Sequence, residues 1–131
     1  MPKGPVPAKF HPLLESAALA HLATIGANGH PQVNPIWFLW RGESIQFGVK
    51  DGTAKLENIR RDPHVALSIL DRDDPGHYVE LRGEVTGIEL YLDLSLVNEL
   101  ARKYTGEDFT GGKVGEPRYR LTMRVDSWTG Q

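Results

Sequence analysis

Residues 44–63 read Ser-Ile-Gln-Phe-Gly-Val-Lys-Asp-Gly-Thr-Ala-Lys-Leu-Glu-Asn-Ile-Arg-Arg-Asp-Pro and carry the strongest structural signal in the chain. This stretch predicts a short apolar strand, a tight turn at Asp51-Gly52 and a basic helix that stops at Asp62-Pro63. Lys55 falls in the first turn of the helix, where the helix dipole and the free N–H groups favour negative charge and disfavour a cation. With the Thr53 hydroxyl and the backbone donors, this lysine predicts a site for a phosphate or another anion.

The same helix also has an interpretation without a ligand. Leu56 and Ile59 would face the core, and Arg60 would suit the carboxyl end of the helix dipole. Glu57 and Arg61 would form an ion pair four residues apart. Solvated helices of this kind are common, so the residues alone leave both interpretations open.

Outside this stretch the pattern is mostly that of short strands. Asn28-Gly29 is a hairpin signal, because primed turns require positive φ angles. Pro31 and Pro35 confine the strand that follows to an edge or a bulge. We expect a helix over 10–18, strands over 19–25, 32–40, 44–49, 64–70, 77–88 and 119–126, a helix over 89–104 and a glycine-rich loop over 105–117. Six antiparallel strands with a few short helices predict a mainly β protein, a closed or split barrel.

Length and composition narrow the classes of protein and site further. The chain has 131 residues, which predicts one domain over 10–131 preceded by a flexible, proline-rich lead-in over 1–9. Its net charge of −2 is spread along the sequence and argues against binding to nucleic acid or to a membrane surface. There is no cysteine, and the five histidines show no metal-ligand spacing, so we expect no metal site. Without a long apolar run or a signal sequence, the expected location is the cytoplasm.

Several segments together resemble the pyridoxamine 5′-phosphate oxidase-like split β-barrel superfamily, whose members bind FMN or the deazaflavin coenzyme F420. The order of strand, turn, Thr-Ala-Lys and Asn-Ile-Arg-Arg-Asp-Pro in residues 44–63 resembles its phosphate-binding segment. Residues 22–25 and 28–38 resemble its first hairpin, and residues 79–85 resemble a later barrel strand. The resemblance covers about residues 10 to 128 and implies a six-stranded antiparallel split barrel of the FMN-binding-protein type.

The resemblance also implies where a cofactor would bind. In the superfamily, the segment after the third strand holds the cofactor phosphate, and the ring lies along the second strand. FMN-binding oxidases usually carry Arg-Lys after the hydroxyl residue, whereas this chain has Ala54-Lys55 and so resembles the deazaflavin-using branch more closely. The implied cofactor-binding residues are Thr53, Ala54 and Lys55 at the phosphate, Val49 and Lys50 at the strand end beside it, Gln32, Val33, Asn34 and Pro35 along the ring, and Arg60 toward the tail of the coenzyme.

The function implied is that of an F420-dependent oxidoreductase. A homodimer would bind the coenzyme in a groove at the subunit interface and pass a hydride to a small conjugated organic acceptor. The deazaflavin carries the chemistry, so no side chain is assigned a catalytic role. The alternatives are an FMN-dependent oxidoreductase of the same fold and a non-catalytic carrier of a flavin or a tetrapyrrole. An oligonucleotide-binding barrel is disfavoured by the acidic balance of charge.

Overall fold

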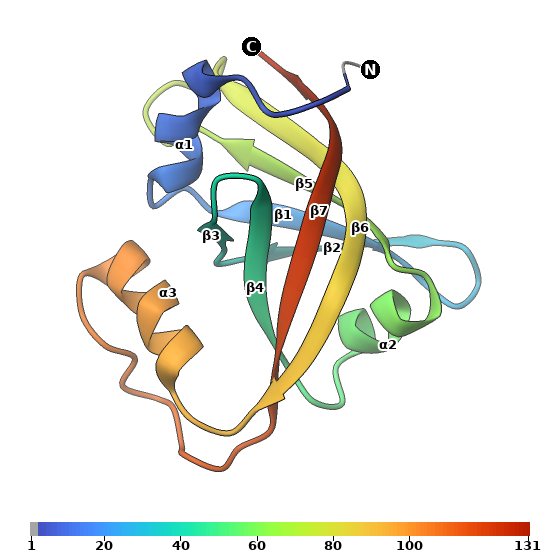
Figure 1. Ribbon diagram of the computed structural model, residues 1–131, viewed down its shortest axis with the longest axis vertical. Helices are drawn as coiled ribbons and strands as arrows, with labels where there is room; N and C mark the ends of the chain where they lie inside the picture. Colours follow the sequence, from blue (N-terminus) through green and yellow to red (C-terminus); the bar gives the residue numbers. More distant parts are fainter. Residues whose placement is uncertain (1–2) are drawn as a thin grey trace.

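The strands of the chain pair into one antiparallel sheet that curls into a half-barrel (Figure 1). The computed structural model describes residues 3–131, and the strand order in its sheet is β2-β1-β5-β6-β7-β4-β3. This architecture confirms the predicted mainly β split barrel. The strands are β1 (Ala20–Ile25), β2 (Pro31–Ile36), β3 (Leu39–Trp40), β4 (Ser44–Lys50), β5 (His64–Leu70), β6 (Tyr78–Tyr91) and β7 (Arg118–Gly130); the helices are η1 (Ala8–Phe10), α1 (His11–Glu15), α2 (Ala54–Arg61) and α3 (Ser95–Thr105).

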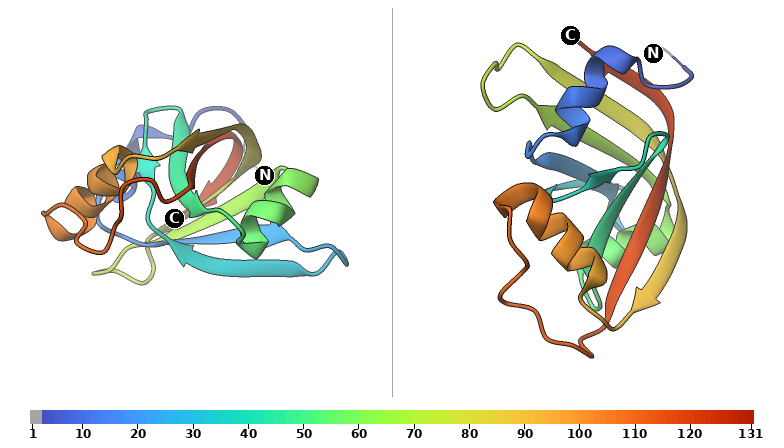
Figure 2. Two further views of the ribbon diagram at one scale, coloured as in Figure 1. Left: turned by 90° about the horizontal axis from the view of Figure 1, so that it is seen from below. Right: turned by 60° about the vertical axis from the view of Figure 1, so that its left-hand side comes forward.

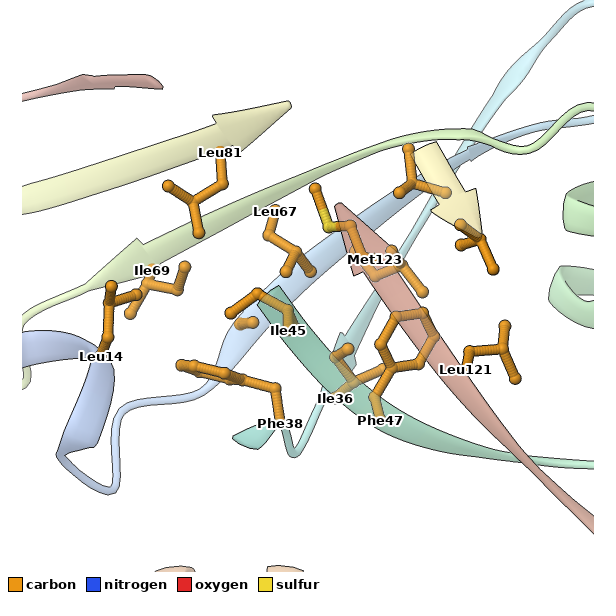
Figure 3. Close-up of a cluster of buried hydrophobic side chains, with 14 of the residues drawn as sticks. Leu14, Ile36, Phe38, Ile45, Phe47, Leu67, Ile69, Leu81, Leu121 and Met123 are labelled. Carbon is orange, nitrogen blue, oxygen red and sulfur yellow. The ribbon is translucent and has the colours of Figure 1, made fainter. Parts of the chain in front are cut away.

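The concave face of the sheet carries the core, because apolar residues alternate along each strand. In β4, Ile45 and Phe47 are fully buried, and in β7 Leu121 and Met123 are fully buried as well. Figure 3 shows these side chains converging with residues of the other strands. α3 lies beside β4 (Figure 2). Leu96 and Leu100 of this helix face Gly48, on the side of β4 away from the main core, and form a second, smaller apolar cluster.

The strand predicted over 32–40 is two strands, so the sheet has seven members instead of six. The ladder stops because the Phe38 N–H donates to the Tyr104 hydroxyl at 3.3 Å and the Phe38 carbonyl accepts from Lys103 Nζ at 2.8 Å. Both partners belong to α3, and local sequence does not reveal them. The break leaves β2 and β3 at opposite edges of the sheet.

The boundary between the sixth strand and α3 also differs from the prediction. β6 continues to Tyr91, and α3 begins only at Ser95, whereas we expected a helix from residue 89. Asp93 turns the chain between the two elements, because its carboxylate accepts from both the N–H and the hydroxyl of Ser95, two residues on. Of the leucines at 90, 92, 94 and 96, only Leu90 therefore belongs to the strand.

The N-terminal segment, expected to be a flexible lead-in, packs against the barrel from residue 3 onward. Lys3 pairs with Ser127 of β7, and Val6 is buried in the main core. The helix expected over 10–18 is shorter, since η1 and α1 together span 8–15. The first two residues of the expected lead-in lie outside the described part of the chain.

Candidate functional site

A pocket of about 260 Å³ lies where α3 meets the ends of four strands and the first turn of α2. Its wall is apolar on the α3 side and cationic on the side of β4, α2 and β7. The lining residues are Pro35 and Ile36 at the end of β2, Trp37 just after it, Gly48, Val49 and Lys50 in β4, Lys55 in α2, Tyr91 in β6, Val97 and Leu100 in α3, Phe109 in the following loop and Arg118 in β7.

The register of β4 and β7 brings the cationic side together. Lys50 and Arg118 are direct partners in this antiparallel pair. Lys55 follows β4 by one turn and lies in the first turn of α2. Two segments that are far apart in the sequence therefore place three cations at one pocket.

Gly48 allows Tyr91 to lie close against β4. A Cβ atom at Gly48 would come within 3.1 Å of the Tyr91 hydroxyl, which is tighter than an ordinary contact. Burial raises the pKa of Tyr91, although the nearby Arg118 and Arg120 oppose this shift. Tyr91 therefore presents a neutral phenol to the pocket at physiological pH.

The charges of the pocket are only partly balanced within the protein. Glu116 Oε1 lies 3.4 Å from Lys50 Nζ, and Glu116 Oε2 accepts from Arg118 Nη2 at 3.1 Å. Lys55 makes no ion pair or hydrogen bond with the described residues, and burial lowers its pKa. Three cations face one carboxylate, which leaves a net charge of +2.

The Arg118 guanidinium has a hydrogen-bonding deficit. Its side chain is only 6% exposed, and its Nη1 is buried without a partner in the described structure. Such unsatisfied donors are rare, because each costs about 1–3 kcal/mol. An unpaired buried guanidinium nitrogen and an unpaired half-buried ammonium fit a ligand with anionic groups, such as the phosphate of a flavin or deazaflavin cofactor.

Four of the ten residues predicted for cofactor binding line this pocket: Pro35, Val49, Lys50 and Lys55. Thr53 lies just before α2, and its hydroxyl donates to the Lys50 carbonyl at 3.0 Å. Ala54 is exposed on the first turn of the helix. The structure therefore gathers the strand-turn-helix segment around the pocket as the sequence indicated.

The other predicted residues lie elsewhere. Gln32 and Asn34 bond to each other at 2.7 Å, and Asn58 of α2 donates to Gln32 at 3.1 Å. Gln32 thus links β2 to α2, Asn34 holds Gln32, and neither side chain lines the pocket. Val33 is 59% exposed on the edge strand.

Arg60 does not line the pocket either. It pairs with Glu57 at 2.9 Å and lies over the ring of Tyr119 at 4.9 Å. The ion pair predicted between Glu57 and Arg61 was wrong, because Arg61 turns to the carbonyl of Ile25 and to the Asn58 side chain.

Sequence reasoning missed the other side of the pocket. Arg118 and Tyr91 belong to strands whose partners depend on the whole sheet, and Trp37 lies at a strand break set by α3. The available signal was the Glu-Pro-Arg sequence at 116–118, which places two opposite charges at the start of a strand.

Two negative findings apply to residues 3–131. No group of three histidine, cysteine or acidic side chains there could hold a metal ion. No helix of that region is long and apolar enough to cross a membrane.

Known proteins resemble this chain over almost its full length. A solved structure of an F420 reductase is 34% identical, covers 96% of this chain and 100% of its own, and superimposes with a TM-score of 0.87. The conserved hypothetical protein Rv2991 from Mycobacterium tuberculosis is 22% identical, with 98% of this chain and 85% of its own covered and a TM-score of 0.72. A Clostridium acetobutylicum protein of the pyridoxinephosphate oxidase family, related to general stress protein 26, is 18% identical, with coverages of 96% and 90% and a TM-score of 0.67.

The last two structures share the fold alone. No curated protein matches the chain. The family model described as pyridoxamine 5′-phosphate oxidase matches residues 6–130, which include the half-barrel, the pocket and the strand-turn-helix segment over 44–63. Fold, pocket and sequence match agree, and the chain belongs to the pyridoxamine 5′-phosphate oxidase family.

Proposed function

We propose that this protein is an F420-dependent oxidoreductase that passes a hydride from the reduced coenzyme to a small conjugated organic acceptor. The observation that carries the proposal is Lys55, a half-buried and unpaired ammonium in the first turn of α2, in a pocket with a net charge of +2. The 34% identity to an F420 reductase supports an oxidoreductase of this family, and the deazaflavin is our choice of cofactor within it.

The residues around Lys55 favour the deazaflavin over FMN. FMN ends in one phosphate monoester, and the residue before the lysine is Ala54, so the arginine usual in FMN-binding oxidases is missing here. F420 continues beyond its phosphate into a lactyl and glutamate tail, and the glutamate residues carry free carboxylates. A pocket with a cation on α2 and another on β7 suits a ligand with more than one anionic group.

The protein would contribute position, charge and exclusion of water. When bound, the coenzyme supplies the two-electron hydride chemistry. Lys55 would anchor the phosphate, which fixes the remainder of the coenzyme relative to the barrel. Trp37, Leu100 and Phe109 form an apolar wall that keeps water away from the anchored group.

We further propose that the working form is a homodimer. Ligand sites usually measure about 300–1,000 Å³, so a pocket of about 260 Å³ cannot enclose a whole flavin-sized ligand. β2 is an exposed edge strand with Val33 at its surface. A further pocket of about 410 Å³, with Ala23, Ile25 and Ala66 in its lining, marks the outer face of the neighbouring strands as a surface that a second copy would cover.

Titration of the purified protein with F420 and with FMN tests the cofactor. We expect F420 to bind much more tightly, and Lys55→Ala to weaken F420 binding by about tenfold to a hundredfold, since a charge-assisted hydrogen bond contributes about 1.5–3 kcal/mol. Lys9→Ala is the matched control, because Lys9 is exposed and lies outside the pocket. Equal F420 affinity in wild type and Lys55→Ala would refute the phosphate site, and tighter FMN binding by the wild type would refute the deazaflavin assignment.

A further inference from the structure

Glu116 and Arg118 form an incomplete carboxylate–guanidinium contact at the pocket. Arg118 Nη2 donates to Glu116 Oε2 at 3.1 Å, and Arg118 Nη1 has no partner among the described residues. The second oxygen of Glu116 turns to Lys50 Nζ at 3.4 Å. One carboxylate is thus shared between two cations and satisfies neither fully.

The division of Glu116 between two cations leaves the Arg118 fork half filled. A guanidinium binds a carboxylate best through two parallel N–H···O bonds, in which each oxygen takes one donor. Glu116 reaches only one nitrogen of the fork, because its other oxygen faces Lys50. A carboxylate approaching from the pocket would not be divided in this way and could take both nitrogens.

The two partners also differ in exposure and in how their backbone is held. The Arg118 side chain is 6% exposed and starts β7, where its backbone pairs with β4. The Glu116 side chain is 35% exposed and follows Gly115, which has a φ of +90° and ends the glycine-rich loop. The Gly115 N–H is held by the Leu92 carbonyl at 2.7 Å, so a change of Glu116 rotamer would leave the backbone on both sides in place.

We propose that Glu116 is a displaceable internal carboxylate, and that a ligand carboxylate replaces it on the Arg118 fork. This inference rests on the proposed function, since the glutamate tail of F420 supplies the carboxylate while its phosphate occupies Lys55. Arg118 and Lys50 then form a second anionic subsite that selects carboxylate-bearing ligands over those with a phosphate alone. Glu116 competes with the tail and sets the affinity for it.

The test is a titration of F420 and FMN against wild type, Glu116→Gln and Arg118→Lys. Glu116→Gln removes the competing charge, so F420 should bind about three- to tenfold more tightly while FMN binding changes less than about twofold. Arg118→Lys keeps the charge but loses the fork, so F420 should bind at least about tenfold more weakly, again with FMN unchanged. Glu107→Gln is the matched control, because Glu107 is an exposed carboxylate in the same loop and the substitution removes the same charge.

The control variant separates displacement of Glu116 from a general effect of charge. If Glu107→Gln tightens F420 binding as much as Glu116→Gln, the effect is general electrostatics and the inference is overturned. The inference is also overturned if Glu116→Gln leaves F420 affinity unchanged. A thermal melt of this variant checks that it is folded. If wild type does not bind F420, the proposed function fails before any variant is measured; a glutamyl tripeptide is then titrated, and equal binding to wild type and Glu116→Gln would reject the subsite.

Discussion

Ala54 is exposed on the first turn of α2, one residue before Lys55. Its methyl group adds no charge at a place where the start of a helix and a lysine already favour an anion. At this position the chain has alanine where FMN-binding oxidases usually have arginine, so the two forms of the segment differ here in one side chain. Residue 54 is where we expect the choice between FMN and F420 to be made.

The first prediction concerns Ala54→Arg. The added guanidinium would lie beside the phosphate, so FMN affinity should rise by about tenfold while F420 affinity rises less. The ratio of the two dissociation constants, measured by calorimetric titration, should narrow accordingly. Ala27→Arg adds the same charge in the exposed turn after β1 and should leave the ratio unchanged. An unchanged ratio in Ala54→Arg would show that this position does not select the cofactor.

The sequence disclosed only the local half of the pocket. Lys55 could be found because its position in a helix follows from the adjacent Asp51-Gly52 turn. Arg118 could not be found, because its closeness to Lys50 depends on the pairing of β4 with β7. Gln32 and Asn34 were assigned to the cofactor. In the structure they bond to each other, and Gln32 also accepts a hydrogen bond from Asn58 of α2.

At the scale of elements, β6 is a long strand bent by two irregularities in its pairing with β7. One falls between Arg82 and Gly83, where a Cβ atom at Gly83 would lie 1.7 Å from the Arg124 carbonyl oxygen. No real side chain fits there without a shift of backbone. The glycine thus lets β7 approach closely as the sheet curls into the half-barrel.

The second prediction compares two glycines of β6. Gly83→Ala should lower the free energy of unfolding by about 1–3 kcal/mol or more, because the methyl group must push β7 away. Gly87→Ala should change it by no more than about 0.5 kcal/mol, since the nearest atom to its Cβ would be 3.8 Å away. Urea unfolding of the two variants gives the comparison. Equal stability would mean that β7 adapts at no cost.

Regular strands were predictable and interrupted ones were not. β5 was predicted over its observed range, and the strand predicted over 119–126 lies within β7, which continues to Gly130. The break after β2 was missed because the Tyr104 hydroxyl and the Lys103 ammonium take the Phe38 backbone groups out of the ladder. Local patterns contain no record of such tertiary partners.

At the scale of the whole molecule, Lys103 and Tyr104 link α3 to the N-terminal helix α1 and to the segment between β2 and β3. Lys103 Nζ donates to the carbonyls of Leu14 and Phe38, and the Tyr104 hydroxyl donates to the Ala18 carbonyl. Burial lowers the pKa of Lys103 to about 8 and raises the pKa of Tyr104 to about 12. These opposite shifts make this junction sensitive to alkaline pH.

The third prediction follows from the sign of each shift. The unfolded chain binds more protons at Lys103 between pH 8 and its ordinary pKa of 10.5, so this group raises stability as pH rises through that range. Tyr104 acts in the opposite sense between its ordinary pKa of 10 and about 12, where stability falls.

Urea midpoints measured from about pH 7.5 to 11.5 test both contributions. Relative to wild type, Lys103→Met should lose the rise above about pH 8, and Tyr104→Phe should lose part of the fall above about pH 10. A difference between wild type and Lys103→Met that stays constant across this range would contradict the assignment for Lys103.

The fourth prediction concerns assembly. If a second copy covers the edge of β2 and the outer face of the sheet, light scattering at micromolar concentration should give twice the chain mass of 14.6 kDa. Val33→Lys should shift the distribution toward the monomer, because a charge in a buried contact is costly. A monomeric wild type would remove the dimer and the interface location of the cofactor ring together.

The pairing of β4 with β7 also has a kinetic meaning. The two strands are neighbours in the sheet, although α2, β5, β6 and α3 all separate them along the chain. Closing so long a loop costs entropy before any contact repays it, so we expect this pair to form late in folding. Lys55 can reach its helical position early, but the pocket exists only once Arg118 lies beside Lys50. During refolding, ligand binding should therefore recover later than the circular dichroism signal of the helices. The delay would report when β7 docks against β4.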